Sequence, residues 1–213
     1  TGVQTCALPI LKADNLNDFC TKIADRITKS KKTVEIDESL LYNSSCNRDD
    51  GKITLTNKGD GSVASMDLKT GEADKALAPS ADAHRSVYLA YPSFNYIIHN
   101  TSSEVAAVSR LGKNMKPLLD DFAQICGPKV KIASIDKCAK ALKGKNAVLV
   151  KDLGALCCGA VEGDAQAVDM IMSKSCLTLL GTKIFGKAKA INPVEALLMR
   201  VVYLTKYSKQ ASK

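Results

Sequence analysis

The chain has 213 residues, a formal net charge of +8, eight cysteines and no tryptophan. No apolar run is long enough to span a bilayer and no signal-peptide pattern is present, so we expect neither a membrane protein nor a secreted one. The positive charge does not by itself indicate a nucleic-acid-binding protein, because no basic run is interleaved with aromatic residues for base stacking. The irregularly spaced cysteines predict reduced, mostly buried thiols and a cytoplasmic protein.

Residues 1–10, TGVQTCALPI, resemble a translated sequencing adapter joined to a reading frame. We therefore interpret them as a non-native scar and leave them out of the fold argument. Under this interpretation Cys6 is not native, and the scar could stand in place of native residues that preceded Leu11. Residues 11–213 have the length of one domain with its own core, and we expect a single domain.

The first half of the chain predicts one helix followed by short strands. An amphipathic helix is expected over residues 16–29, and a strand near residues 34–36. An Asp-Gly turn at residues 49–51 precedes alternating residues 52–56, which indicates a hairpin. After a second turn, residues 62–68 predict another strand and residues 69–78 a polar loop.

The second half alternates helices with strands. A helix carrying His84 and Tyr88 is stopped by Pro92, and a strand then runs to His99. Further along, we expect helices over residues 102–111, 116–125, 135–142 and 164–180, and strands over residues 129–133, 146–151 and 155–159. The last helix has Asn192 as N-cap, Pro193 in its first turn, Glu195 placed for a capping box, and an apolar face from residue 194 to 204.

Two of the strand connections are hairpins, which excludes a purely parallel sheet. We therefore predict an α/β fold of three layers, in which helices flank a central, mixed and largely antiparallel sheet.

The order of these pieces resembles the class II aldolase/adducin family. The resemblance rests on the segment 43–56 followed by Gly59, the helix with His84 and Tyr88, the strand IIHNTS, and the hairpin NAVLVKDLGALCCG. It runs from about residue 16 to residue 207. It implies a relationship to zinc-dependent sugar-phosphate aldolases, to ribulose-phosphate 4-epimerases and to the catalytically silent adducin head domain.

The resemblance also implies a zinc site, of which this chain keeps one residue. The family has His-x-His at the end of the strand and a third His before the Gly of the later hairpin. His99 matches the first ligand, Thr101 stands at the second, and Leu153 stands at the third. A hydroxyl is a poor zinc ligand beside imidazole and leucine is none, so we expect no zinc unless the ancestral site is retained. A hydrogen-bonded imidazole is the alternative role for His99.

The family's acidic residue and phosphate-binding turns are matched in part. Asp82 is the candidate general acid or base, although counting back from His84 puts Ser80 at that position. The phosphate-contacting residues implied by the resemblance are Asn43, Ser45, Thr56, Gly59 and Ser80. Lys58 lies close to them in sequence, so an anion could bind there.

Three interpretations remain open. The first is an aldolase-fold protein that has lost zinc catalysis and serves a ligand-binding, regulatory or subunit role. The second is an active aldehyde-lyase or 4-epimerase on fuculose, rhamnulose or ribulose phosphate, with missing ligands supplied by a neighbouring subunit. The third is a basic, nucleic-acid-associated protein, which the residues favour least. The expected partners are a small phosphorylated sugar or related anion, and further copies of the chain or a paralogous subunit.

Overall fold

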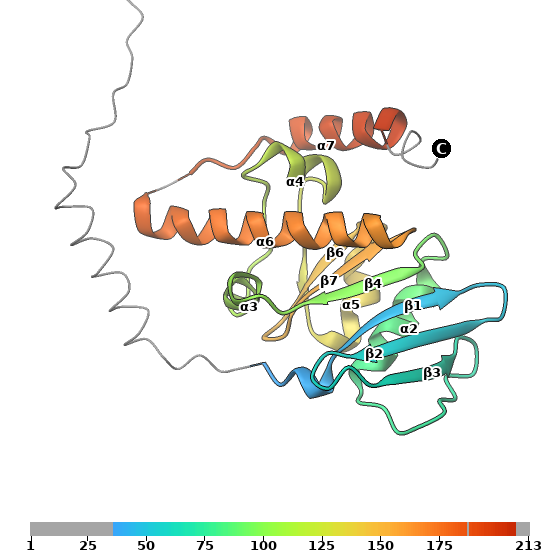
Figure 1. Cartoon of the computed structure of the whole chain (residues 1–213). Helices are drawn as coiled ribbons and strands as arrows, with labels where there is room; N and C mark the ends of the chain where they lie inside the picture. The colour runs from blue at the N-terminus through green and yellow to red at the C-terminus, as the bar shows by residue number, and fades with distance from the viewer. Residues whose placement is uncertain (1–35, 187, 208–213) are drawn as a thin grey trace, which may run out of the picture. The chain divides into compact units, whose positions relative to one another are not determined.

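The computed structural model describes residues 36–186 and 188–207 (Figure 1). The scar assigned to residues 1–10, the helix expected over residues 16–29 and most of the strand expected at residues 34–36 lie outside this part of the chain. Within it, no helix has both the length and the apolarity needed to cross a bilayer.

Seven strands form one sheet, in the order β3-β2-β1-β4-β7-β6-β5. All neighbouring strands pair antiparallel except β5 and β6, which pair parallel. The predicted mixed, largely antiparallel sheet is therefore confirmed. The strands are β1 (Tyr42–Asn47), β2 (Lys52–Asn57), β3 (Val63–Asp67), β4 (Tyr96–Asn100), β5 (Ile132–Ala133), β6 (Ala147–Val150) and β7 (Gly154–Gly159).

Helices lie on both faces of the sheet, as predicted. On one face α2 and α5 share an apolar cluster with the sheet, and on the other face α3, α4 and α6 share a second cluster. Successive side chains of a strand point to opposite faces of the sheet, so the adjacent residues Cys157 and Cys158 belong to different apolar clusters. The helical elements are η1 (Glu38–Leu40), α2 (Ser80–Ala90), α3 (Ser103–Ser109), α4 (Asp120–Ile125), η2 (Ile135–Lys137), α5 (Cys138–Leu142), α6 (Glu162–Phe185), α7 (Pro193–Val202) and the π-helical turn η3 (Tyr203–Tyr207).

Two predicted elements are shorter in the structure. The helix expected from residue 116 begins only at Asp120, because Met115 pairs with Val130 in an extended bridge just before it. The strand expected over residues 129–133 reduces to β5 for the same reason, since Val130 is committed to that bridge. The first turn of α4 carries Asp120 and Asp121, whose carboxylates favour a helix N-terminus.

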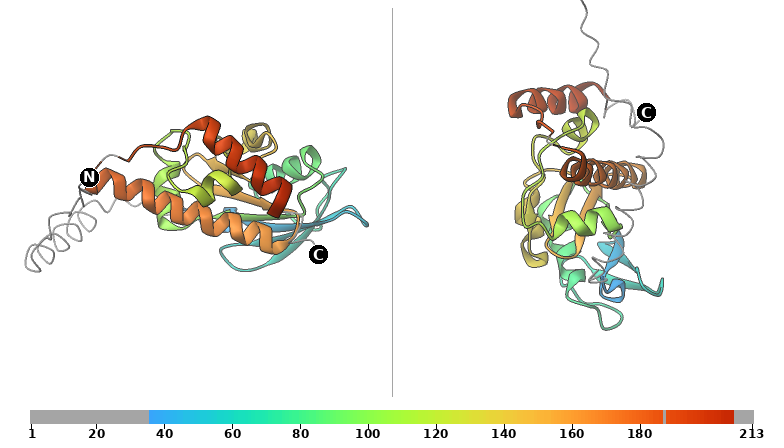
Figure 2. Two further views of the ribbon diagram at one scale, coloured as in Figure 1. Left: turned by 90° about the horizontal axis from the view of Figure 1, so that it is seen from above. Right: turned by 90° about the vertical axis from the view of Figure 1, so that its left-hand side faces the viewer.

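The last helix, α7, differs most from expectation. Its N-cap is confirmed, since Asn192 Oδ1 accepts a hydrogen bond from the Val194 N–H at 2.9 Å. However, α7 packs against α4 through Ala196 and Arg200, outside the helix layer (Figure 2). Four of its apolar side chains are 49 to 67% exposed: Val194, Leu197, Leu198 and Val201. Arg200 is buried while these apolar side chains are exposed, because its guanidinium donates hydrogen bonds to Gln124 O and Asn146 Oδ1.

Candidate functional site

The centre of the candidate site is the end of β4, the middle strand of the sheet. Alternation along β4 places His99 on the face covered by α2, together with Ile97. Asn100 lies on the opposite face, where its amide donates to Asp169 O and Ser173 Oγ of α6. His99 is completely buried. The predicted strand therefore carries its histidine into the core and not into an open cleft.

His99 is held by two hydrogen bonds to the protein itself. Its backbone N–H donates to Asn43 Oδ1 at 2.9 Å, and its ring Nε2 lies 2.8 Å from Leu153 O. A carbonyl oxygen can only accept, so Nε2 carries the proton and Nδ1 carries the lone pair. The residue at the position of the family's third zinc ligand thus binds His99 through its backbone.

Gly154 brings the β6–β7 turn close enough for this bond. Its φ is +97°, and a Cβ at this position would lie 2.0 Å from Asn100 O. Only glycine fits both the left-handed backbone and the close approach. The Gly of the predicted hairpin is thus what places Leu153 against His99.

The second histidine, His84, belongs to a buried hydrogen-bond network. Its Nδ1 lies 2.7 Å from Ser44 Oγ, which in turn lies 2.8 Å from the Tyr88 hydroxyl. Tyr88 also donates to Ser44 O at 2.9 Å. His84 is thus fully buried and linked to Tyr88 through Ser44.

The two imidazoles face a common interior, with ring centroids 6.3 Å apart. His84 Nε2 and His99 Nδ1 are buried and have no hydrogen-bond partner among the described residues. Burial lowers the pKa of His84 to about 3, helped by the nearby His99, and burial lowers the pKa of His99 to about 4. Both rings are therefore neutral at pH 7.

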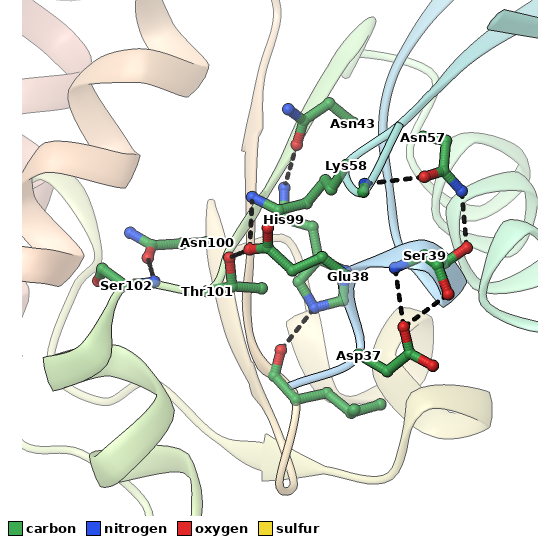
Figure 3. Close-up of polar contacts among 12 residues, drawn as sticks. Asp37, Glu38, Ser39, Asn43, Asn57, Lys58, His99, Asn100, Thr101 and Ser102 are labelled. Carbon is green, nitrogen blue, oxygen red and sulfur yellow. Dashed lines mark hydrogen bonds and ion pairs between the residues drawn. The ribbon is translucent and has the colours of Figure 1, made fainter. Parts of the chain in front are cut away.

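A charged rim, made of Glu38 and Lys58, lies beside His99 (Figure 3). Glu38 of η1 accepts a hydrogen bond from the Thr101 hydroxyl, and the same oxygen, Oε1, lies 3.7 Å from Lys58 Nζ. Lys58 disfavours a proton on His99, whereas Glu38 favours one, so both charges act at the end of β4. Sequence reasoning missed Glu38, because it lies 63 residues from Thr101 and before any recognised motif.

Two of the five predicted phosphate-contacting residues, Gly59 and Ser80, contact η1, and two more pair with each other in the adjoining strands. Asn43 pairs with Thr56 across β1 and β2. Gly59 packs on Ser39, where an added Cβ would lie 2.9 Å from Ser39 Cα. Ser80 donates its hydroxyl to Leu40 O. The structure thus brings these residues together, largely through bonds to the chain itself.

The fifth residue, Ser45, and the candidate acid Asp82 lie elsewhere. Ser45 is further along β1, opposite Thr54 and Tyr96. Asp82 is exposed in the first turn of α2, whereas the next residues of the helix, Ala83 and His84, turn into the core. The structure does not bring the Asp82 side chain to the buried histidines.

A comparison with protein-family models matches residues 47–179, more than half of the chain, to the Class II Aldolase and Adducin N-terminal domain. The chain belongs to the class II aldolase/adducin family. The resemblance found in the sequence is confirmed. A comparison with curated proteins gives no match.

Solved structures share the class II aldolase fold with this chain. An L-fuculose 1-phosphate aldolase is 18% identical, with a TM-score of 0.70 over 91% of this chain and 98% of that chain. YgbL from Escherichia coli, a putative aldolase/epimerase/decarboxylase, is 18% identical, with a TM-score of 0.63 over 87% of this chain and 97% of that chain. The L-fuculose 1-phosphate aldolase from Glaciozyma antarctica PI12 is 18% identical, with a TM-score of 0.62 over 92% and 86%. At these identities the likeness establishes the fold alone.

The residues at the end of β4 do not fit the three-histidine zinc site of the family. His99 uses Nε2 for Leu153 O, the Thr101 hydroxyl is bonded to Glu38, and Leu153 has no ligating side chain. In the part of the chain that the structure describes, no three His, Cys, Asp or Glu side chains are grouped to hold an ion. One imidazole cannot supply the three nitrogen donors that such a centre needs.

Proposed function

We propose that this protein has lost zinc-dependent catalysis and serves a ligand-binding, regulatory or subunit role on the class II aldolase fold. One observation carries the proposal: the His99 Nε2–H is bonded to the carbonyl of Leu153 in a fully buried setting. A zinc ion at that nitrogen would have to displace both a proton and a hydrogen bond, with two of the three ligands replaced.

The ligand we propose is a small phosphorylated sugar or a related anion. Lys58 supplies a positive charge, and its side chain is only 17% exposed, so water screens it weakly. The Thr101 hydroxyl and the Asn43 amide add polar groups at the same strand end.

We further propose that the protein acts in a reducing compartment such as the cytoplasm, as a homo-oligomer or with a paralogous subunit. Six cysteines in the described residues are free and buried, which suits reduced thiols. The exposed aliphatic side chains of α7 are a surface that assembly would cover. Light scattering on the purified chain gives its mass in solution and tests the oligomer.

An active aldehyde-lyase or epimerase is the second candidate, favoured by the fold shared with L-fuculose 1-phosphate aldolase. In that case a neighbouring subunit would have to supply the missing ligands. Retro-aldol turnover of L-fuculose 1-phosphate, measured with and without added zinc, separates the two candidates. We expect no turnover above background under either condition. Zinc-dependent turnover that disappears in His99→Ala would overturn the proposed loss of catalysis.

A further inference from the structure

We propose that Lys58 and Thr101 form an anion site which the chain fills with its own Glu38 carboxylate, so that a phosphate-bearing ligand binds by displacing Glu38. This inference rests on the proposed function, since it concerns the ligand site named there. The new element is that Glu38 competes with the ligand for Lys58 and Thr101.

One hydrogen-bond donor and one ammonium group lie around the same oxygen of Glu38. The Thr101 hydroxyl donates to Oε1, and Lys58 Nζ lies 3.7 Å from the same atom (Figure 3). A hydroxyl and an ammonium on one anionic oxygen are the contacts that a phosphate oxygen would receive. The Glu38 carboxylate therefore stands where a ligand's anionic oxygen would sit.

The exposure of the two partners is unequal. The Lys58 side chain is 17% exposed, whereas that of Glu38 is 43% exposed. The cation is thus fixed within the protein, and the carboxylate lies at the surface from which it can rotate into water. A carboxylate leaving the site regains full hydration, so displacement costs little more than the ion pair itself.

The backbone of η1 does not need to move for this exchange. Asn57 Nδ2 donates to Ser39 O at 2.7 Å, and the Lys58 N–H donates to Leu41 O at 2.9 Å. These bonds hold the residues that follow the glutamate, Ser39 and Leu41, against the end of β2 and the β2–β3 turn. Displacement is therefore a rotation of the Glu38 side chain and leaves the fold unchanged.

A phosphate monoester suits the site better than a second carboxylate. It carries up to two charges and three acceptor oxygens, so it can engage Lys58, Thr101 and further donors at once, whereas Glu38 presents a single charge.

The test is calorimetric titration of the full chain with inorganic phosphate and with L-fuculose 1-phosphate. Glu38→Gln removes the competing charge and keeps the shape, so we expect about two- to fivefold tighter binding than in the wild type. Lys58→Met should abolish binding, also when combined with Glu38→Gln. Asp136→Asn makes the same change in net charge at an exposed position of η2 and should leave affinity unchanged.

The outcomes separate this inference from the proposed function. Binding to the wild type that is no tighter in Glu38→Gln overturns the displacement by Glu38, and leaves anion binding in place. An equal gain in affinity in Asp136→Asn assigns the effect to net charge and also overturns the displacement of Glu38. Absence of binding in every variant, including a Lys58→Arg variant that keeps the charge, overturns both the ligand site and the anion-binding function.

Discussion

The buried histidine pair and the charged rim lie side by side at the end of β4, and they differ in what their polar groups do. His84 and His99 are enclosed, neutral and bonded to Ser44 and to Leu153 O. Lys58 and Glu38 form an ion pair in which the Glu38 side chain is 43% exposed. The difference shows that one strand end can hold neutral, enclosed imidazoles on one side and a charged ion pair beside them.

The largest effect is expected at acidic pH, where the buried histidine pair should lower the stability of the fold. An unfolded histidine has a pKa near 6.5, whereas His84 and His99 have pKa values of about 3 and about 4 in the fold. Below pH 6.5 the two histidines bind protons in the unfolded chain but stay neutral in the folded protein. The free energy of unfolding should therefore fall as pH drops from 6.5 to 4, by on the order of 3 kcal/mol per histidine.

Imidazole NMR titration checks this directly, because the chain has only two histidines. We expect both rings to stay neutral at pH 5 while urea unfolding becomes easier. An imidazole in the folded protein that titrates near pH 6.5 would show that it is open to water, and the contrast between core and rim would disappear.

Removing the His99 ring should cost about 2 to 4 kcal/mol of unfolding free energy. His99→Ala leaves a cavity in the core and deprives Leu153 O of its donor. Asp82→Ala, at an exposed position of α2, is the matched control and should stay within about 0.5 kcal/mol of the wild type. Equal stability of the two variants in urea unfolding would contradict a structural role for His99.

Adjacent serines on β1 offer a sharper contrast. Ser44 joins His84 to Tyr88, so Ser44→Ala should lose about 1 to 3 kcal/mol by leaving buried polar groups unpaired. Ser45 faces the other side of the strand, and Ser45→Ala should lose less than about 0.5 kcal/mol. Chemical unfolding of both variants decides; a larger loss for Ser45→Ala would reverse the assignment of the buried network.

The rim should matter least for stability. Glu38→Ala removes a partly exposed ion pair, for which we expect a loss below about 1 kcal/mol at low salt and less at high salt. Thermal unfolding in both conditions measures it. A loss of several kcal/mol, independent of salt, would make Glu38 a structural residue and count against its displacement by a ligand.

Much of the fold could be predicted from local signals. Alternation and turn signals located β2, β3, β6 and β7, whereas no strand was predicted at β1, and helical spacing located a helix over residues 164–180, which lies within α6. These patterns succeed because a strand or helix that covers one core repeats its apolar residues at a fixed period.

Features set by distant contacts could not be predicted. The bond between His99 and Leu153 O spans 54 residues, and that between Thr101 and Glu38 spans 63. The outward face of α7 depends on Arg200 reaching Gln124 and Asn146, which reverses the usual burial of an amphipathic helix. No local period encodes such pairings, so the candidate site emerged only once the elements were placed together.

Elemental analysis shows whether this family member uses the histidine end of β4 to bind zinc. The full chain is purified after expression with added zinc and then dialysed, in parallel with His99→Ala. We predict far less than one zinc per chain, and the same low content in both proteins. One zinc per wild-type chain, lost in His99→Ala, would contradict the account.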